Sequence, residues 1–273
     1  MSINMDLVIS TSDDSVDMKT GLDTMSGVSG SVQTIAETIL LKKAPHRNSG
    51  KKKVRTTLKK TFKGSYGQNF SIDVYDDELS KRLRSITRPV FVELISYFFA
   101  ESLYKESGEL SQRASKVVED LGNEANELVR QLRKSPLNKL HEVSRKFNLE
   151  VKVRYKKSRY DQIVLGEFDR STAEAVDAKK SREQYWINAG ISRFNINTGN
   201  GRLVVKGHED TVAFGFAQYK NLTMTAKKVF TENLNFNNGL EVEDYKYFDL
   251  WVSPVKLKDG TVVKYMVKGY KID

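Results

Sequence analysis

The sequence predicts an α+β fold, in which an N-terminal domain of sheet and helices precedes a small C-terminal β-barrel of the SH3 or OB type. Apolar residues recur every three or four positions in 18–39 and in most of 89–147, as they do on the buried face of a helix. Residues 54–74 and much of 185–273 instead alternate between apolar and polar, which is typical of strands. Both kinds of element therefore contribute to the fold.

Two domains and a connector are expected. Residues 1–160 form the N-terminal domain, and 185–273 form the barrel, because five or six short strands in this length are enough to close one. Residues 161–184 are charged and poor in apolar side chains, so we interpret them as a connector. Within it, 163–168 has the pattern of a short strand and 171–183 that of a helix.

The N-terminal elements follow the order strand, helix and hairpin. A strand at 5–10 precedes the amphipathic helix of 18–39, and a hairpin of 54–62 and 70–74 turns at 64–67 with its basic residues facing outward. Three glycines in the helix each cost roughly 1 kcal/mol of propensity relative to alanine. Small residues let backbones approach, so we expect this helix to pack closely on a sheet. These glycines are Gly21, Gly27 and Gly30.

Three helices are expected between this hairpin and a strand at 149–155. The segment 89–105 is the most apolar and is interpreted as a core helix, while Ser135 followed by Pro136 is a typical helix start. In 109–133 the apolar residues follow a near-heptad spacing. That seam allows a homo-oligomer to form through 109–133, although packing within one domain is the commoner use of such a face.

The C-terminal domain is expected to contain two hairpins, over 191–205 and 246–270, with a short helix at 223–230 between them. Trp186 and Trp251 are interpreted as anchors of the barrel core rather than as residues that stack on a ligand, because tryptophan is highly buried on average.

The composition excludes several classes of protein. With 273 residues, of which 39% are hydrophobic, the chain is not wholly disordered. The absence of cysteine excludes disulfides, a thiol nucleophile and a thiolate zinc site. There is no apolar run of membrane-spanning length and no signal-peptide pattern at the N-terminus, so a cytoplasmic protein without membrane association is expected.

The net charge of +10 comes from one segment. Residues 42–63 carry ten basic and no acidic residues, and the charges of the remaining chain cancel. Such a segment favours contact with nucleic acid or another polyanion. Two alternatives stay open, namely compensation of the acidic residues in 1–41 and docking on an acidic protein. The basic residues are Lys42, Lys43, Arg47, Lys51, Lys52, Lys53, Arg55, Lys59, Lys60 and Lys63.

A second basic cluster has tyrosines interleaved, and aromatic rings among cations can stack on exposed bases. A strand with one solvated face would give the same pattern. The cluster consists of Arg145, Lys146, Lys152, Arg154, Tyr155, Lys156, Lys157, Arg159 and Tyr160, and Tyr66 in the hairpin is a further candidate for stacking.

The spacing of Glu150 and Lys152 matches a motif of Mg²⁺-dependent nucleases, in which carboxylates hold the metal and the lysine steadies the attacking water. That site needs an acidic residue on an adjacent strand, and Asp73 is the strand acid available upstream. The three histidines have no metal-binding spacing and are interpreted as surface residues. No cofactor or resident metal is expected.

Several segments together resemble an uncharacterised bacterial and phage-associated domain family. They are the strand Leu7-Val-Ile9, the hairpin residues Phe62-Lys-Gly-Ser65, the turn Phe194-Asn-Ile-Asn-Thr-Gly-Asn-Gly-Arg-Leu203, and Asp259-Gly260 with Val263-Lys-Tyr265. The resemblance implies a setting of antiviral defence or phage counter-defence. It carries no activity, because these motifs are turn and strand signatures.

We therefore expect a non-enzymatic protein that binds DNA or RNA, or a nucleoprotein, through the 42–63 hairpin and the 145–159 strand. An inhibitor or sensor subunit docking an acidic partner is one alternative. A Mg²⁺-dependent nuclease using Glu150 and Lys152 is the other.

Overall fold

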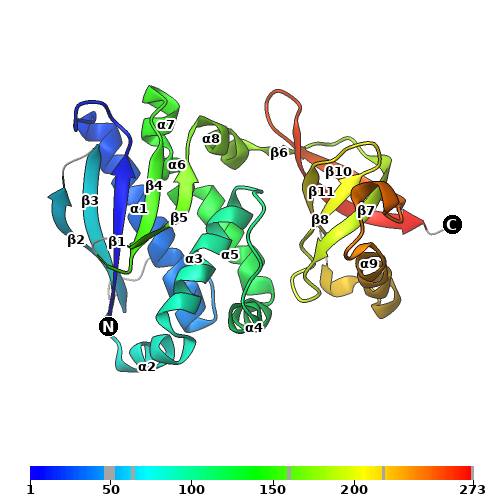
Figure 1. The fold of residues 1–273 in the computed structure, drawn as a ribbon, viewed down its shortest axis with the longest axis horizontal. Helices are drawn as coiled ribbons and strands as arrows, with labels where there is room; N and C mark the ends of the chain where they lie inside the picture. The colour runs from blue at the N-terminus through cyan, green and yellow to red at the C-terminus, as the bar shows by residue number, and fades with distance from the viewer. Residues whose placement is uncertain (46–52, 63–64, 159–160, 217–218, 272–273) are drawn as a thin grey trace. The chain divides into compact units, whose positions relative to one another are not determined.

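An antiparallel sheet of five strands, in the order β2-β3-β1-β4-β5, organises the N-terminal part of the computed structural model (Figure 1). β3 pairs between β1 and β2, and the chain returns through several helices to place β4 on the other side of β1. This is the strand order of a split β-α-β motif, extended at one edge by β5. The strands are β1 (Ser2–Ile9), β2 (Val54–Phe62), β3 (Tyr66–Val74), β4 (Val151–Lys156) and β5 (Gln162–Phe168).

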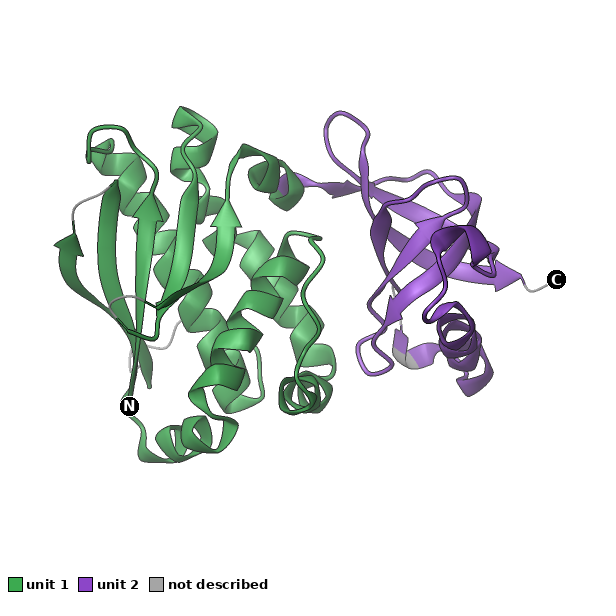
Figure 2. Cartoon of the chain, in the orientation of Figure 1, with its two compact units in different colours: residues 1–176 green, residues 177–273 purple. Residues whose placement is uncertain are grey.

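Two compact units make up the chain, Met1–Val176 and Asp177–Asp273 (Figure 2). The structure describes residues 1–45, 53–62, 65–158, 161–216 and 219–271. Within the described residues, no helix is long and apolar enough to cross a membrane.

The helices of the first unit lie on one face of its sheet (Figure 1). They bury the apolar side of β1, where Ile3, Met5 and Leu7 are almost inaccessible to solvent. The helices are α1 (Met18–Leu41), α2 (Asp77–Ile86), α3 (Arg88–Ser102), α4 (Gln112–Leu121), α5 (Asn123–Lys134), α6 (Pro136–Leu140), α7 (Glu142–Phe147) and α8 (Arg170–Asp177).

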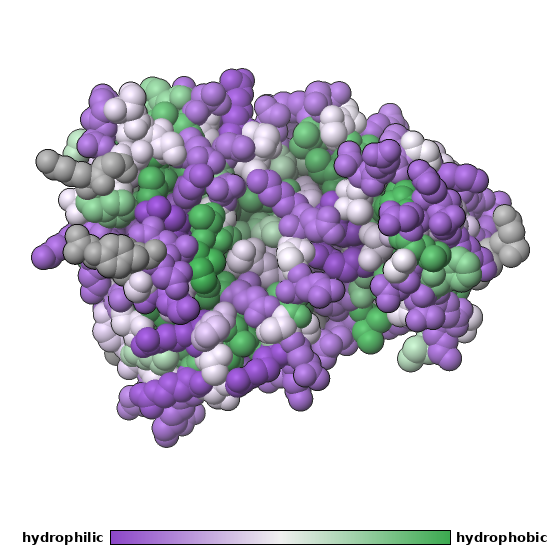
Figure 3. Space-filling view, viewed as in Figure 1, coloured by the Kyte–Doolittle hydropathy of each residue, from purple (hydrophilic) through white to green (hydrophobic). Residues whose placement is uncertain are grey.

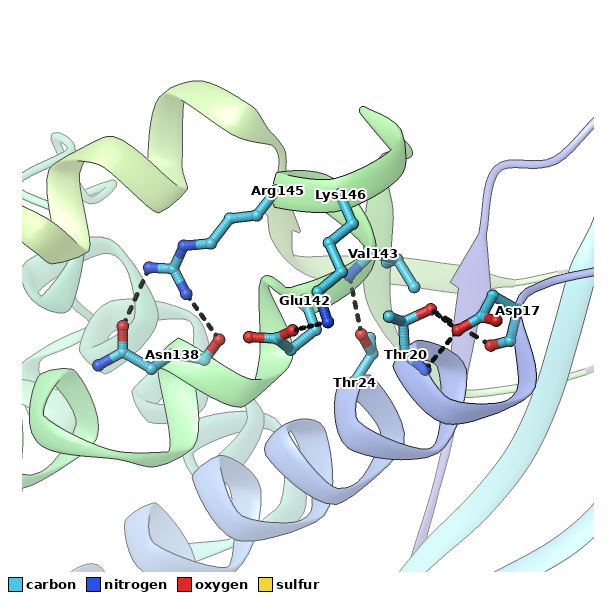
Figure 4. A network of polar contacts seen from close by, with 8 residues as sticks. All are labelled: Asp17, Thr20, Thr24, Asn138, Glu142, Val143, Arg145 and Lys146. Carbon is cyan, nitrogen blue, oxygen red and sulfur yellow. Dashed lines mark hydrogen bonds and ion pairs between the residues drawn. The ribbon is translucent and has the colours of Figure 1, made fainter.

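At Gly27, α1 packs closely against another helix, whereas the sequence predicted close packing against the sheet. A Cβ built on Gly27 would lie 2.1 Å from the backbone nitrogen of Leu140 in α6, so it is this short helix, rather than the sheet, that approaches α1 most closely there. The Thr24 hydroxyl accepts a hydrogen bond from the backbone N–H of Val143 in α7, and the Asp17 carboxylate caps α1 by accepting from Thr20 (Figure 4).

The expected helix over 109–133 is divided at Gly122, whose φ of +51° lies in the left-handed region. α4 ends before it and α5 begins after it, so the apolar residues do not form one continuous seam. Most of them are instead buried in the core of the first unit, as Val118 and Leu128 illustrate, and self-association through 109–133 stays a prediction.

The connector expected at 161–184 is also absent as a separate region. β5 completes the first sheet beside β4, α8 continues the same unit, and β6 (Lys179–Lys180) pairs with β10 of the second unit. The change from one unit to the other falls at Val176 and Asp177. The strand expected at 163–168 is present as β5, but its place in the first sheet was not predicted, because Ile163 on this edge strand is exposed and lowers the apparent apolar content of the segment.

The second unit is a five-stranded mixed barrel, which confirms the predicted α+β class with a C-terminal β-barrel. Its strands pair in the cyclic order β7-β8-β9-β11-β10, and only β9 and β11 run parallel among these pairs. A helix, α9 (Met224–Asn237), joins β9 to β10, as in barrels of the OB type. The strands are β7 (Tyr185–Phe194), β8 (Gly201–Val205), β9 (Thr211–Phe216), β10 (Phe248–Lys256) and β11 (Val262–Lys271).

The barrel interior is filled by aromatic and branched side chains such as Phe214, Phe230 and Leu250. Contrary to expectation, Trp186 and Trp251 do not belong to this core. Trp186 is 43% exposed, and both rings lie on the outer side of the barrel wall, next to each other.

Candidate nucleic-acid interface

The face of the first sheet opposite the helices is open and polar. Alternation in β4 directs Val151 and Val153 into the core, so Lys152, Arg154 and Lys156 lie on the open face. Figure 3, drawn from the side of this face, shows a mainly hydrophilic surface with scattered hydrophobic residues. Three cations of the second basic cluster therefore share one surface.

An aromatic ring lies among these cations. Phe62, the last residue of β2, packs over Gly67 of β3, since a Cβ on that glycine would fall within 2.4–2.7 Å of the ring atoms. The guanidinium carbon of Arg154 lies 5.9 Å from the ring centroid and the Lys156 ammonium 5.6 Å from it. Both distances are within the range of a cation–π contact.

Two polar partners hold these cations in place. The Asp6 carboxylate is fully buried and accepts hydrogen bonds from Arg154 Nε at 2.6 Å and Nη2 at 3.1 Å. The Asn69 side-chain oxygen accepts from the Lys156 ammonium at 2.7 Å. A bidentate arrangement of this kind fixes the plane of the guanidinium as well as its position.

Lys59 and Lys60 project from a bulge in β2 beside this face. The register between β2 and β3 shifts between Leu58 and Thr61, and the amides of Gln68 and Asn69 donate to the backbone oxygens of Lys59 and Lys60. Both lysine side chains are exposed, and neither forms an ion pair with another described residue. Their charge is thus free to act on a ligand.

The other cations of 42–63 are not gathered at this place. Lys42 pairs with Asp120 and Lys53 with Asp76, each at 2.7 Å, and both contacts lower the pKa of the carboxyl group. Arg55 is exposed and lies over the ring of Tyr75, and Lys43 is exposed just after α1. For these two described lysines, the acidic partners are thus in α4 and directly before α2. Arg47, Lys51, Lys52 and Lys63 lie outside the described residues.

Part of the second cluster has a structural use. Lys152 lies between Glu150 and Glu167, at 3.2 and 3.1 Å, and hydrogen bonds to these carboxylates raise its pKa. Lys157 pairs with Asp161 at 3.2 Å. Arg159 and Tyr160 lie outside the described residues.

Figure 4 shows where the remaining two members of that cluster point. Arg145 donates to the backbone and side-chain oxygens of Asn138, and Lys146 pairs with Glu142 at 3.0 Å. The Arg145 contacts link α6 with α7 and leave Arg145 engaged within the fold, whereas the Lys146–Glu142 pair lies within α7.

Two of the tyrosines proposed for stacking are turned toward the helices. Tyr66 and Tyr155 are partly buried against the hydrophobic core of the first unit. An aromatic ring that does lie on the open face is that of Phe62, which we did not predict as a stacking residue. Its sequence signal was a phenylalanine opposite a glycine across a tight hairpin, a pairing in which the ring covers the bare backbone.

The acids of the suggested nuclease site are far apart. Asp73 pairs with Ser2 at one end of β1, whereas the backbone of Glu150 bonds to Ser10, just beyond the other end. Eight residues of strand separate these points, or roughly 26 Å. The two carboxylates therefore cannot share one ion, and among the described residues no group of three metal-binding side chains was found.

His141 differs from the expected surface histidine. It is fully buried, where its ring nitrogens bond to the Leu137 carbonyl at 2.7 Å and to the Thr172 hydroxyl at 3.0 Å. It links α6 to α8. His46 lies outside the described residues.

Asp73 is stabilised as a carboxylate on the open face. Burial opposes its ionisation, but hydrogen bonds from the hydroxyls of Ser2, Thr57 and Ser71 outweigh this and lower its pKa below the ordinary 3.8. Asp73 is thus held in its ionised form by three neutral hydroxyl donors.

We expect Asp73→Asn to reduce the stability of the protein by about 1 kcal/mol at pH 7. Because the folded pKa is depressed, this contribution is present above the unfolded pKa and is lost as the pH falls through the folded value. The gap between wild type and variant in urea unfolding should therefore narrow below pH 3.8. A gap that widens on acidification would contradict the assignment.

No family model, curated protein or solved structure matches this chain. The resemblance noted in the sequence therefore stays a prediction, and the function is argued from the chain's own residues.

Proposed function

We propose that the protein binds single-stranded nucleic acid, without catalysis, on the open face of its first sheet. The observation that carries the proposal is the ring of Phe62, seated on Gly67 with Arg154 and Lys156 beside it. Open antiparallel sheets with aromatic side chains on the free face are suited to splayed bases, and flanking cations to phosphates.

Each group on this face has a role in such a complex. Phe62 supplies a surface for stacking, while Lys59 and Lys60 supply phosphate contacts that do not depend on sequence. Several charges of this face are already paired within the fold, since Asp6 pairs with Arg154 and Lys152 lies between Glu150 and Glu167. Lys59, Lys60 and Lys156 form no ion pair with another described residue. Single strands fit better than a duplex, whose bases are not available for stacking.

The charge-reversal variant Lys59→Glu/Lys60→Glu tests the phosphate contacts. We expect its affinity for a labelled oligo(dT) or oligo(U) to fall at least tenfold in fluorescence anisotropy. The slope of log affinity against log salt should become shallower by about 1.4, since each lost contact with a single strand removes roughly 0.7. The matched control is Lys81→Glu/Lys116→Glu, which reverses two exposed helical lysines and should retain most of the affinity.

Phe62→Leu separates stacking from charge. It should weaken binding severalfold while leaving the salt slope unchanged, because no cation is removed. Two results would overturn the proposal. One is wild-type protein that binds no oligonucleotide at low salt, and the other is equal weakening by both charge-reversal pairs. Co-purification of an acidic protein that only Lys59→Glu/Lys60→Glu releases, without oligonucleotide binding, would favour the docking alternative.

A further inference from the structure

The outer wall formed by β7, β10 and β11 of the barrel carries two adjacent tryptophan rings. Trp186, Trp251 and Gly269 are direct neighbours across these three strands. The two indole rings have centroids 5.3 Å apart and are tilted by 50°. Gly269 places no side chain beside Trp251, so the surface stays open on that side.

Lysines accompany the aromatic rings of this wall. The Lys271 ammonium lies 4.6 Å from the centroid of the Trp186 ring, and the Lys206 ammonium lies 5.9 Å from that of Tyr247. Tyr247 precedes β10 directly, four residues before Trp251, which corresponds to roughly 13 Å of extended chain. Aromatic rings with an associated cation thus occur on β7 and directly before β10, two neighbouring segments of this wall.

Two acids beside this surface are engaged within the fold. Glu183, next to the Gln184 that accepts from the Trp251 indole, pairs with Lys256. Asp249 lies two residues from Trp251 and accepts a hydrogen bond from the Asn188 amide at 2.8 Å. Lys268 and Lys271 are exposed on β11. The local charge is therefore positive, which complements a polyanion better than a neutral glycan.

This wall differs from the side that OB barrels commonly use, which is built on their second and third strands. On the corresponding strands here, Arg202 is only 8% exposed and its guanidinium donates to the Thr211 hydroxyl and carbonyl, both at 2.7 Å. Its charge is directed into the fold. The exposed aromatic surface of the second unit is on the opposite set of strands.

We propose that the wall around Trp186, Trp251 and Lys271 is a second contact surface for single-stranded nucleic acid. Bases stack on the exposed indole, and Lys271, Lys268 and Lys206 contact the neighbouring phosphates. The inference rests on the proposed function for its ligand class, but it concerns a separate set of residues in a separate unit. Two such surfaces on one chain raise the overall avidity for a strand that reaches both.

Intrinsic fluorescence reports on this surface selectively, because the chain contains two tryptophans and both are in it. We expect oligo(dT) to quench the emission of the full-length protein in a saturable way. Trp186→Ala should weaken the affinity seen by the remaining Trp251 emission about tenfold, and Lys271→Glu should weaken it severalfold. Trp186→Phe, which keeps a stacking surface, should restore most of it.

The variant Lys59→Glu/Lys60→Glu separates the two surfaces. If it weakens binding in anisotropy but a saturable quench remains, both proposals are supported. Emission unchanged at oligonucleotide concentrations that saturate the anisotropy signal would overturn this inference and leave the first surface standing. If the wild-type emission is quenched but Lys59→Glu/Lys60→Glu binds as tightly as wild type in anisotropy, the first surface is overturned and this inference stands. Quenching by a neutral oligosaccharide and not by oligo(dT) would overturn the assignment to nucleic acid.

Discussion

Replacing Gly27 with alanine is expected to lower the free energy of unfolding by about 3 kcal/mol, which for a unit of this size means a fall of roughly 6–12 °C in Tm. The added Cβ would lie 2.1 Å from the nitrogen and 2.6 Å from the Cα of Leu140, and 2.7 Å from the carbonyl carbon of Lys139. These are backbone atoms, so no side-chain rotation relieves the overlap. Either α6 moves away from α1 or α1 bends.

Gly30→Ala is the matched control on the same helix. Its Cβ would meet only the side chain of Pro136, at 3.3 Å, and the gain in helix propensity of about 1 kcal/mol offsets that tight contact. We expect its Tm to stay close to that of wild type in thermal unfolding followed by circular dichroism. Hydrogen exchange should show lost protection in α1 and α6 for Gly27→Ala. Equal Tm values for the two variants would contradict the close approach.

The local patterns of the sequence predicted the helices and strands better than they predicted which elements pack against each other. The three- and four-residue spacing of 18–39 predicted α1 almost to its ends, and the alternation of 54–74 predicted the hairpin. Small residues in α1 indicated a close neighbour, but many neighbours would satisfy that pattern. The sequence does not say that the five-residue helix α6 is the one that reaches Gly27.

Two differences between the predicted and the observed organisation depend on single residues, which the periodicity of apolar residues does not reveal. At Gly122 a single left-handed residue ends one helix and starts another, while the apolar spacing continues across it. In β5, Leu165 and Phe168 are buried but Ile163 and Val164 are exposed, so the strand predicted at 163–168 was assigned to a connector instead of to the first sheet. A local average of hydropathy misses both, because the decisive contribution comes from one or two residues.

The candidate site shows the same difference between what local sequence patterns predict and what depends on residues distant in the chain. The lysines could be counted from the sequence, but which of them remain unpaired depends on acids distant in the chain, as Lys42 and Asp120 are 78 residues apart. For the barrel the signal was present and was misread. Leu250 and Val252 point inward, so strand alternation places Trp251 outside, whereas we relied on the average burial of tryptophan.

Removing the carboxylate of Asp6 is expected to cost about 3 kcal/mol, because Asp6→Ala leaves the Arg154 guanidinium without its partner in a position only 22% exposed. Asp6→Asn retains the shape and one acceptor and should cost less. The double variant Asp6→Ala/Arg154→Leu removes both charges, so it should recover part of the loss. Urea unfolding with an unchanged m-value would attribute these differences to stability rather than to a change in compactness.

The same pair links stability to the proposed function. The Asp6 carboxylate holds the Arg154 guanidinium beside the Phe62 ring. Because this carboxylate is fully buried, water does not take its place as the partner of Arg154. Asp6→Asn should therefore weaken oligonucleotide binding although it makes the open face more positive, which is the opposite of what net charge predicts. Tighter binding by Asp6→Asn, with its folded state verified by circular dichroism, would mean that charge alone governs this face and that the placement of Arg154 is unimportant.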